Sequence, residues 1–290
     1  MTHRRFVTLT VAPAMILLIA LALVSIVGAV WLSLMDMSLR YPESEFAGLF
    51  NYERLMRDRR FINALWVSLE WQLITVTGTL LLAILLSVMI VETVKSRFWR
   101  NVICFAFLVP VLLPRVAAAF VWRYIYSPSI GILNWFLGLF GIGPVEFLAD
   151  PDIALLAVAA VDIWQWGLFF TVILVKLLET IPREPVEAAL LDRARTWQIH
   201  AYITLPMLKG PIISLAFVKA VESLRSFDLI YVMTGGGPGT TTETLDLYAY
   251  QQGINLGGRV SYAAAMSILL LIATVIAFTV IWRVVRRWAD

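Results

Sequence analysis

Long uncharged hydrophobic stretches recur along the chain at the length that a bilayer requires. Because the hydrocarbon core of a membrane is about 30 Å thick, a spanning helix needs about 20 predominantly apolar residues. Three stretches of this length contain no Asp, Glu, Lys or Arg, namely residues 6–35, 71–91 and 260–282. The pattern predicts a transmembrane helix in each of them.

Three weaker stretches contain charged residues within otherwise apolar sequence. Residues 101–122 include Arg115, residues 153–175 include Asp162, and residues 205–233 include several charges. With these three, the pattern predicts an all-α membrane protein with six transmembrane helices. Neither an internal repeat nor a long linker interrupts the series, so we predict a single domain.

Composition supports a membrane protein and removes other classes. Of the 290 residues, 60% are hydrophobic and 15% are charged, against about 45–50% and about 25% in soluble domains. The net charge of +3 is better explained by cytoplasmic loops than by a nucleic-acid surface, so we predict no nucleic-acid partner. One cysteine, Cys104, and two distant histidines, His3 and His200, offer no ligand pattern for a metal. We therefore predict one transmembrane domain, residues 1–290, in contact with membrane lipid.

Lys and Arg near the predicted spans indicate the orientation, because cytoplasmic loops are enriched in them. They favour an orientation with both termini in the cytoplasm. One loop, residues 36–70, opposes this orientation, since it would lie outside and holds several arginines among acidic residues. The uncharged run of residues 6–35 is longer than a signal-peptide core of about 7–15 residues, so we expect it to remain in the chain. With both termini in the cytoplasm, the following basic residues lie on that side: Arg4, Arg5, Lys95, Arg97, Arg100, Lys176, Arg183, Arg193, Arg195, Arg283, Arg286 and Arg287.

A short amphipathic helix is predicted in the loop of residues 181–206, between the fourth and fifth spans. Pro182 and Pro185 end the preceding helix, and Pro185 can occupy the first turn of a new one, with Glu187 near its positive end. Two interpretations are open: a solvated connector, or a docking element whose small residues Ala188 and Ala189 enter a groove of a cytoplasmic partner. Its apolar stripe is formed by Val186, Ala189, Leu190 and Ala194.

The same loop carries a long motif. Glu187-Ala188-Ala189, then Asp192 and Ala194, then Ile203, Leu205 and Pro206 resemble the EAA loop of permease subunits of bacterial ABC importers, E-A-A-x-x-D-G-A followed by I-x-L-P. The resemblance favours docking over a connector. Arg193 replaces the usual glycine, and because glycine suits the turn that ends a helix whereas arginine favours continuing it, this departure bears on the geometry of the turn. The resemblance assigns coupling to an ATPase to Glu187, Ala188, Ala189, Asp192, Arg193 and Pro206.

The region from Phe227 to Pro238, with Thr242-Glu243-Thr244 and Tyr250, is similar to the end of the fifth helix and its outer loop in the sugar-type branch of these permeases. Maltose, glycerol-phosphate and polyol permeases belong to that branch. Ala12-Pro13 and the stretch Pro110 to Pro114 also fit. The run from Gly235 lacks the Gly-Lys-Ser/Thr ending of a phosphate-binding loop, so we predict a turn-rich loop and no ATP site in this chain.

This resemblance implies a type I ABC importer permease (MetI-like) fold in the bacterial inner membrane. It implies four kinds of neighbour: a second homologous permease subunit, two ATPase subunits, an extracytoplasmic substrate-binding protein and lipid. ATP and Mg²⁺ would be bound by the ATPases, this chain would hold no cofactor and catalyse no reaction, and transport would proceed by alternating access. The solute stays open between a sugar, a polyol, a glycerol phosphodiester and a sulfonated relative. The alternatives are a self-contained secondary transporter or channel, for which no ion-coupling chain is visible, and an intramembrane enzyme.

Charged and polar residues within the predicted spans are candidates for the substrate path. Lys219, Glu222, Arg225 and Asp228 alternate in sign at a spacing of three, and a self-neutralising ladder and a role in the path are equally favoured. Asp162, Gln165 and two neighbouring indoles can bind a polyhydroxylated solute, but interhelical packing is the favoured interpretation. The candidate path residues are Asp162, Trp164, Gln165, Trp166, Lys219, Glu222, Arg225 and Asp228.

Overall fold

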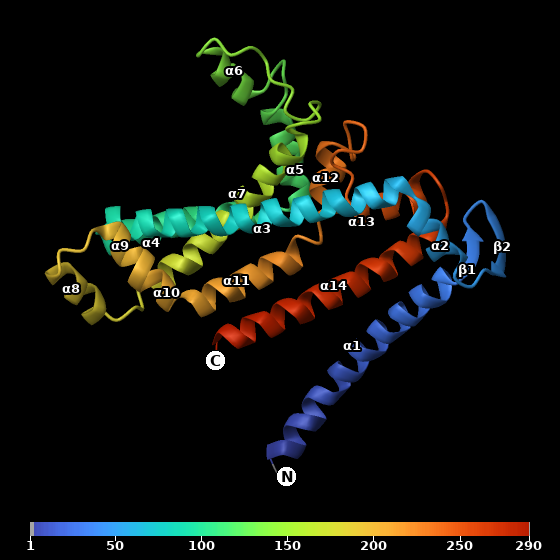
Figure 1. Ribbon diagram of the computed structural model, residues 1–290, viewed down its shortest axis with the longest axis horizontal. Coiled ribbons are helices and arrows are strands. Elements are labelled where there is room, and N and C mark those ends of the chain that lie inside the picture. Colours follow the sequence, from blue (N-terminus) through green and yellow to red (C-terminus); the bar gives the residue numbers. More distant parts are fainter. Residues whose placement is uncertain (1–2, 290) are drawn as a thin grey trace. The chain divides into compact units, whose positions relative to one another are not determined.

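The computed structural model describes residues 3–289, and helices dominate them (Figure 1). The chain forms two compact units. One comprises the residues up to Ile62 together with Tyr248–Val284, and the other is centred on Asn63–Leu247. This division leaves the single domain over residues 1–290 as a prediction, and each unit is described by itself.

The first unit begins with a long apolar helix, and a short hairpin and helix follow it. In α1 the side chains of Ile16 and Val24 are 66% and 73% exposed, so its apolar surface is available to lipid or to another subunit. The hairpin is antiparallel, with Met35 opposite Phe46. The elements are α1 (His3–Ser33), β1 (Met35–Ser38), β2 (Tyr41–Phe46), α2 (Phe50–Arg57), η2 (Gln251–Asn255) and α14 (Val260–Ala289).

Asp58 joins several elements of the first unit. Its Oδ2 accepts hydrogen bonds of 2.6 Å from the hydroxyls of Tyr248 and Tyr262, and its Oδ1 accepts from the backbone N–H of Arg60 at 2.9 Å. Burial raises the pKa of this carboxyl, but these hydrogen bonds and one from the N–H of Phe61 outweigh it and hold the pKa below its ordinary value. Asp58 thereby accepts hydrogen bonds from backbone N–H groups in the first turn of α3 (Arg59–Thr93), which have no partner within the helix.

The second unit is built around α7, the most buried of the three long apolar helices. Gly167 of α7 lies against Leu82 of α3, where a Cβ atom would come within 2.7 Å of the leucine side chain. Small residues of this kind let membrane helices approach closely. Phe170 and Leu174 extend the same contact into an apolar core.

The helices of the second unit are α3 (Arg59–Thr93, whose first turn lies in the first unit), α4 (Arg97–Leu112), α5 (Arg115–Ile125), α6 (Ile132–Gly138), α7 (Ala154–Leu178), α8 (Glu184–Leu191), α9 (Thr196–Ile199), η1 (His200–Thr204), α10 (Leu205–Met207), α11 (Lys209–Glu222), α12 (Phe227–Met233) and α13 (Leu245–Tyr250, which lies in the first unit from Tyr248 on).

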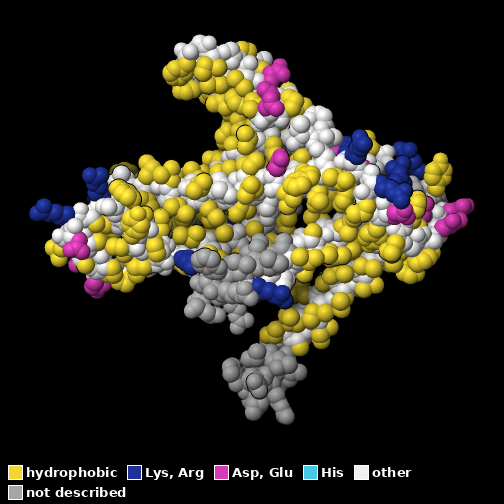
Figure 2. Space-filling model, viewed as in Figure 1, with side chains coloured by type: hydrophobic (Ala, Val, Ile, Leu, Met, Phe, Trp, Pro, Cys, Tyr) yellow, Lys and Arg dark blue, Asp and Glu magenta, His cyan; other side chains and the backbone are white. Residues whose placement is uncertain are grey.

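Three described helices are long and apolar enough to cross a membrane: Thr10–Ser33, Arg59–Thr93 and Ala154–Leu178. The total rises to five if each of two sharply bent pairs forms one span, and Val260–Ile276 is a shorter apolar helix within the described part of α14. The exact count of six stays a prediction. Hydrophobic side chains cover most of the face shown in Figure 2, while charged side chains gather near α8 and near α2 with the β1–β2 hairpin.

The predicted third helix, residues 101–122, is not continuous. Its two halves, α4 and α5, meet at a bend of 97°. Leu113 takes an extended conformation because it precedes Pro114, which disfavours helical backbone before it. The amide of Gln165 in α7 donates to the carbonyl of Pro110 at 3.0 Å. A side chain from a neighbouring helix therefore satisfies a carbonyl next to the break, as a buried break in a membrane protein requires.

The predicted fifth helix, residues 205–233, is also interrupted. The segment before α11 is bent by 72° from it, and α12 starts after a second break. Neighbouring side chains again satisfy the exposed backbone, since the indole of Trp71 donates to the carbonyl of Ser223 at 3.1 Å and Arg115 donates to the carbonyl of Arg225 at 2.7 Å. Local apolar composition predicts the membrane region but not these breaks.

The glycine-rich loop after α12 has the predicted turn-rich structure. Gly235 and Gly236 have positive φ angles of 63° and 96°, which glycine adopts without steric cost. The hydroxyl groups of Thr234 and Thr242 are 2.7 Å apart and close the base of the loop.

Candidate functional site

The predicted short helix is present as α8, between α7 and the segment that leads into α11. Pro185 lies in its first turn, where a missing N–H costs nothing, and Glu184 and Glu187 lie near its positive end. No side chain of α8 is buried. The local signals in the sequence were therefore sufficient to position this helix.

Arg193 ends α8 in the conformation that a glycine would adopt. Its φ angle is +57°, and it is the one non-glycine residue with positive φ in the described part of the chain. The N–H of Ala194 donates to the carbonyl of Ala189 and the N–H of Arg193 donates to that of Leu190, both at 3.0 Å. This pair of bonds is the Schellman motif. Arginine thus does not continue the helix, and it occupies a left-handed conformation that costs about 1 kcal/mol.

The two sides of α8 have different surroundings. Val186 and Leu190 line a cavity between α8 and the ends of the long helices. Glu187 and Ala188 are exposed, and Leu191 is 85% exposed. Asp192, Arg193 and Pro206, the other candidates for coupling, are also exposed. The predicted docking residues therefore lie on an open surface, apart from Ala189, which is half-buried.

A π-helix, η1, follows α9 and ends beside a proline. The N–H of Leu205 donates to the carbonyl of His200, five residues before it, and the next residue, Pro206, has no N–H to donate. This widened turn, η1, contains the buried His200.

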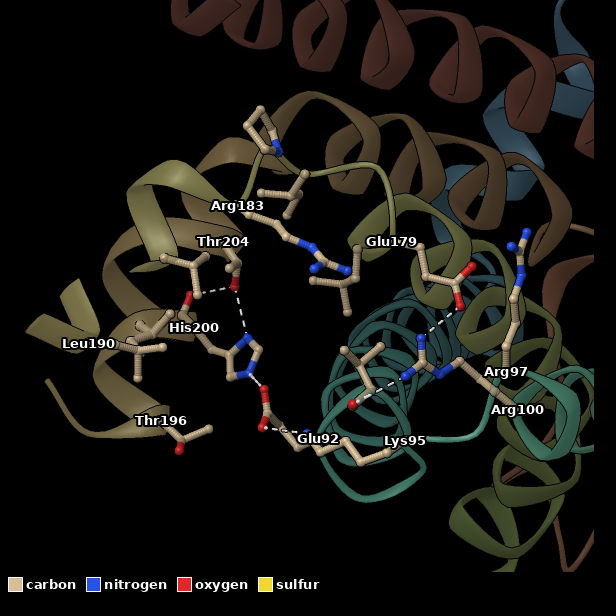
Figure 3. Close-up of a pocket in the computed structure, with 16 residues that line it drawn as sticks. Glu92, Lys95, Arg97, Arg100, Glu179, Arg183, Leu190, Thr196, His200 and Thr204 are labelled. Atoms are coloured by element: carbon tan, nitrogen blue, oxygen red, sulfur yellow. Dashed lines mark hydrogen bonds and ion pairs between the residues drawn. The ribbon is translucent and has the colours of Figure 1, made fainter. Parts of the chain in front are cut away.

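His200 links this segment to α3. Its Nε2 lies 3.0 Å from Oε1 of Glu92, and its Nδ1 lies 2.9 Å from Oγ1 of Thr204 (Figure 3). This contact joins the segment after α8 to the end of a long apolar helix. The place of His200 could not be predicted from the sequence, because its partner Glu92 lies 108 residues away.

Four charged side chains form a closed network at the breaks of the helices. Lys219 donates 2.6 Å hydrogen bonds to Asp162 and to Glu222. Arg115 donates to Glu222 at 2.5 Å and also to Asp162. The side chains of Asp162 and Lys219 are fully buried. Two cations and two anions therefore balance one another and join α5, α7 and α11.

This network assigns partners to some candidate path residues and not to others. In the predicted ladder, Lys219 forms an ion pair with Glu222. The break after α11 separates Arg225 and Asp228 from this pair, and the side chains of both are not buried. The network also contains Arg115, which was not among the predicted path residues. It is 107 residues from Glu222, so no local pattern relates the two.

The aromatic and amide candidates in α7 contact other helices. Trp164 packs edge-on against Trp122 of α5 with ring centroids 5.4 Å apart, and Lys219 Nζ lies 5.2 Å from the ring centre of Trp166. Gln165 donates to α4, but its Oε1 atom is buried without a hydrogen-bond partner in the described part of the chain. These contacts agree with interhelical packing and leave one acceptor unused.

The model of the family described as "binding-protein-dependent transport system inner membrane component" matches residues 79–290. The chain belongs to this family. It is the permease subunit of an ABC importer and not itself a catalytic subunit.

Relatives of this permease cover nearly its whole length. It is 32% identical to the trehalose/maltose transport system permease protein MalF of Thermococcus litoralis, over 97% of this chain and 93% of the relative. It is 29% identical to the sulfoquinovosyl glycerol transport system permease protein SmoG of Agrobacterium fabrum, over 98% and 91%. A third relative, the trehalose transport system permease protein SugA of Mycobacterium tuberculosis, is 29% identical over 96% and 88%.

A solved structure shares the fold. The permease superposes with a TM-score of 0.83 on a chain of a bacterial ABC transporter involved in the import of the acidic polysaccharide alginate, with 22% identity over 97% of this chain and 95% of the other. The predicted type I importer permease fold is therefore confirmed.

Proposed function

We propose that this permease carries a sugar, a polyol or a related polyhydroxylated solute across the inner membrane by alternating access. Its relatives are named for trehalose, maltose and sulfoquinovosyl glycerol, all of them rich in hydroxyl groups. In this proposal the permease pairs with a second, homologous permease, and an extracytoplasmic binding protein delivers the solute. Two ATPase subunits bind ATP and Mg²⁺, and both termini of the permease lie in the cytoplasm.

The observation that carries the coupling role is the geometry of α8. It is a two-turn helix with an exposed Glu187-Ala188 face, and it is held by a glycine-like cap rather than by buried side chains. The link from His200 to Glu92 provides a route from this helix to α3. We propose that Glu187, Ala188, Ala189, Asp192, Arg193 and Pro206 contact the ATPase, so that closure of the ATPases tilts the helices connected to α8.

For the substrate path we propose a division of roles. The network of ion pairs leaves its members engaged with one another: Asp162, Lys219, Glu222 and Arg115. In this proposal these residues hold the broken helices together beside the path. Gln165 has a free acceptor, and the neighbouring indoles of Trp164 and Trp166 offer apolar faces for a sugar ring. Arg225 and Asp228 are not buried and remain available to the solute or to the second permease.

Reconstitution tests this function. The permease is incorporated into proteoliposomes with its partner subunits, and uptake of labelled trehalose, maltose and glycerol-linked sugars is measured with ATP and with a non-hydrolysable analogue. We expect uptake only with hydrolysable ATP and a loaded binding protein. Uptake by the permease alone, in vesicles without ATP, would instead establish a self-contained transporter and refute the proposal.

A further inference from the structure

A cavity of about 700 Å³ lies behind α8 and has no role in the mechanism above. It is enclosed by the end of α3, the start of α4, the end of α7 and the segment from α8 to η1 (Figure 3). All of these elements belong to the second unit. The cavity is comparable in size to sites that hold small organic ligands, which occupy about 300–1,000 Å³.

The cavity carries an excess of positive charge. Four of its lining residues are Lys or Arg and two are Glu, since Lys95, Arg97, Arg100 and Arg183 face Glu92 and Glu179.

Both carboxylates are already engaged. Arg100 binds Glu179 at 2.9 Å, and Glu92 contacts Lys95 at 3.6 Å and His200 at 3.0 Å. Burial raises the pKa of Glu179, but hydrogen bonds from Arg100 and Lys176 outweigh it and lower the pKa below its ordinary value, so this carboxylate stays charged and paired.

Two arginines are left over. Within the described part of the chain, neither Arg97 nor Arg183 makes a side-chain hydrogen bond or ion pair, and both side chains are exposed. Figure 3 shows Arg183 extending from its loop toward the middle of the cavity, whereas the side chain of Arg97 extends past Arg100 and Glu179 on the side away from Arg183. A hollow surface with two uncompensated guanidinium groups attracts an anion, and guanidinium binds phosphate oxygens in a two-pronged geometry.

The remaining lining is apolar and lies at the end of the membrane helices. Val91 and Leu178 come from the last turns of α3 and α7, and Ile199 comes from the segment after α8. Next to Arg97, the side chains of Phe98 and Trp99 are 69% and 60% exposed. Trp is enriched in membrane proteins at the level of the lipid headgroups. The cavity therefore combines a cationic side and an apolar side next to a helix end that carries Trp99, which suits an amphiphile better than a free ion.

We propose that this cavity binds the phosphodiester headgroup of an anionic phospholipid, with Arg183 as its phosphate ligand and with the exposed side chain of Arg97 turning inward as a second ligand. Basic pockets between membrane helices are physically suited to such headgroups. The bound lipid lies between α8 and the helices that α8 is connected to. This site is distinct from the docking face of Glu187 and Ala188 and from the network around Asp162.

Native mass spectrometry of the purified full-length permease tests the proposal. The detergent-solubilised chain is titrated with phosphatidylglycerol and, separately, with zwitterionic phosphatidylcholine. We expect selective retention of phosphatidylglycerol. Each of Arg97→Gln and Arg183→Gln should weaken its binding by about fivefold, and the double variant by the product of the two factors.

Arg195→Gln is the matched control, because Arg195 is an exposed arginine of the same loop outside the cavity, and its affinity for phosphatidylglycerol should equal that of the wild type. Unchanged melting temperatures will show that the variants are folded. Equal binding of both lipids, or undiminished phosphatidylglycerol binding by the double variant, would overturn the site. If glycerol phosphate or inorganic phosphate displaces the lipid at equal concentration, the cavity binds a soluble phosphate and the assignment to a lipid is wrong.

Discussion

Arg193 stores a small amount of backbone strain at the end of α8. A glycine at this position adopts the same left-handed conformation without a Cβ penalty, so Arg193→Gly should stabilise the cap by about 1 kcal/mol. We expect hydrogen exchange of the α8 amides to slow by about fivefold, since opening of this short helix determines their protection. Arg195→Gly is the control, because Arg195 has an ordinary φ of −74°, and it should give no such protection. Faster exchange in Arg193→Gly would show that the arginine side chain stabilises the turn.

Asp162 and Lys219 are fully buried partners in the network that joins α5, α7 and α11. Asp162→Asn leaves Lys219 and Arg115 facing a single carboxylate, so we expect a loss of about 3–5 kcal/mol and a clear drop of the melting temperature in detergent. Asp162→Asn combined with Lys219→Met removes one charge of each sign and should recover a large part of the loss. Additive losses in the double variant would mean that the two residues act independently.

Among the elements of the first unit, Asp58 connects the end of α2, the start of α3, Tyr248 at the end of α13, and α14. Because its folded-state pKa lies below its ordinary value, the stabilisation is present above about pH 4 and is lost as pH falls through the folded pKa. Melting temperatures measured from neutral pH down to about pH 3 should therefore fall less steeply in Asp58→Asn than in the wild type. Asp36→Asn, an exposed-strand control, should leave the slope unchanged. Identical slopes for wild type and Asp58→Asn would contradict this role.

Elements defined by local signals could be predicted from the sequence. Apolar length indicated the long helices, and prolines with acidic residues indicated α8. The breaks in the third and fifth predicted helices could not be predicted, because their stability depends on distant donors. Gln165 and Trp71 bind carbonyls far away in the chain. The β1–β2 hairpin was likewise missed, since its strands are far shorter than the apolar runs that indicate membrane spans.

Across the whole molecule, the proposed coupling residues are local in sequence, so the motif of residues 187–206 could predict them. The contacts that join distant segments are not local. His200 to Glu92, beside the proposed coupling segment, and Arg115 to Glu222, among the broken helices, join residues about a hundred positions apart. Such pairings follow from tertiary packing and leave no periodic signal.

A charge reversal on the exposed face of α8 tests the proposed transmission of force from the ATPase subunits to the membrane helices. Uptake of labelled solute by the complete reconstituted transporter is compared for the wild type, Glu187→Lys and Glu43→Lys, which reverses an exposed acid in the hairpin. Because like-charge contacts at an interface are costly, Glu187→Lys should lower uptake by at least about tenfold, with the permease still inserted and paired, while Glu43→Lys transports normally. Wild-type uptake by Glu187→Lys would contradict the account.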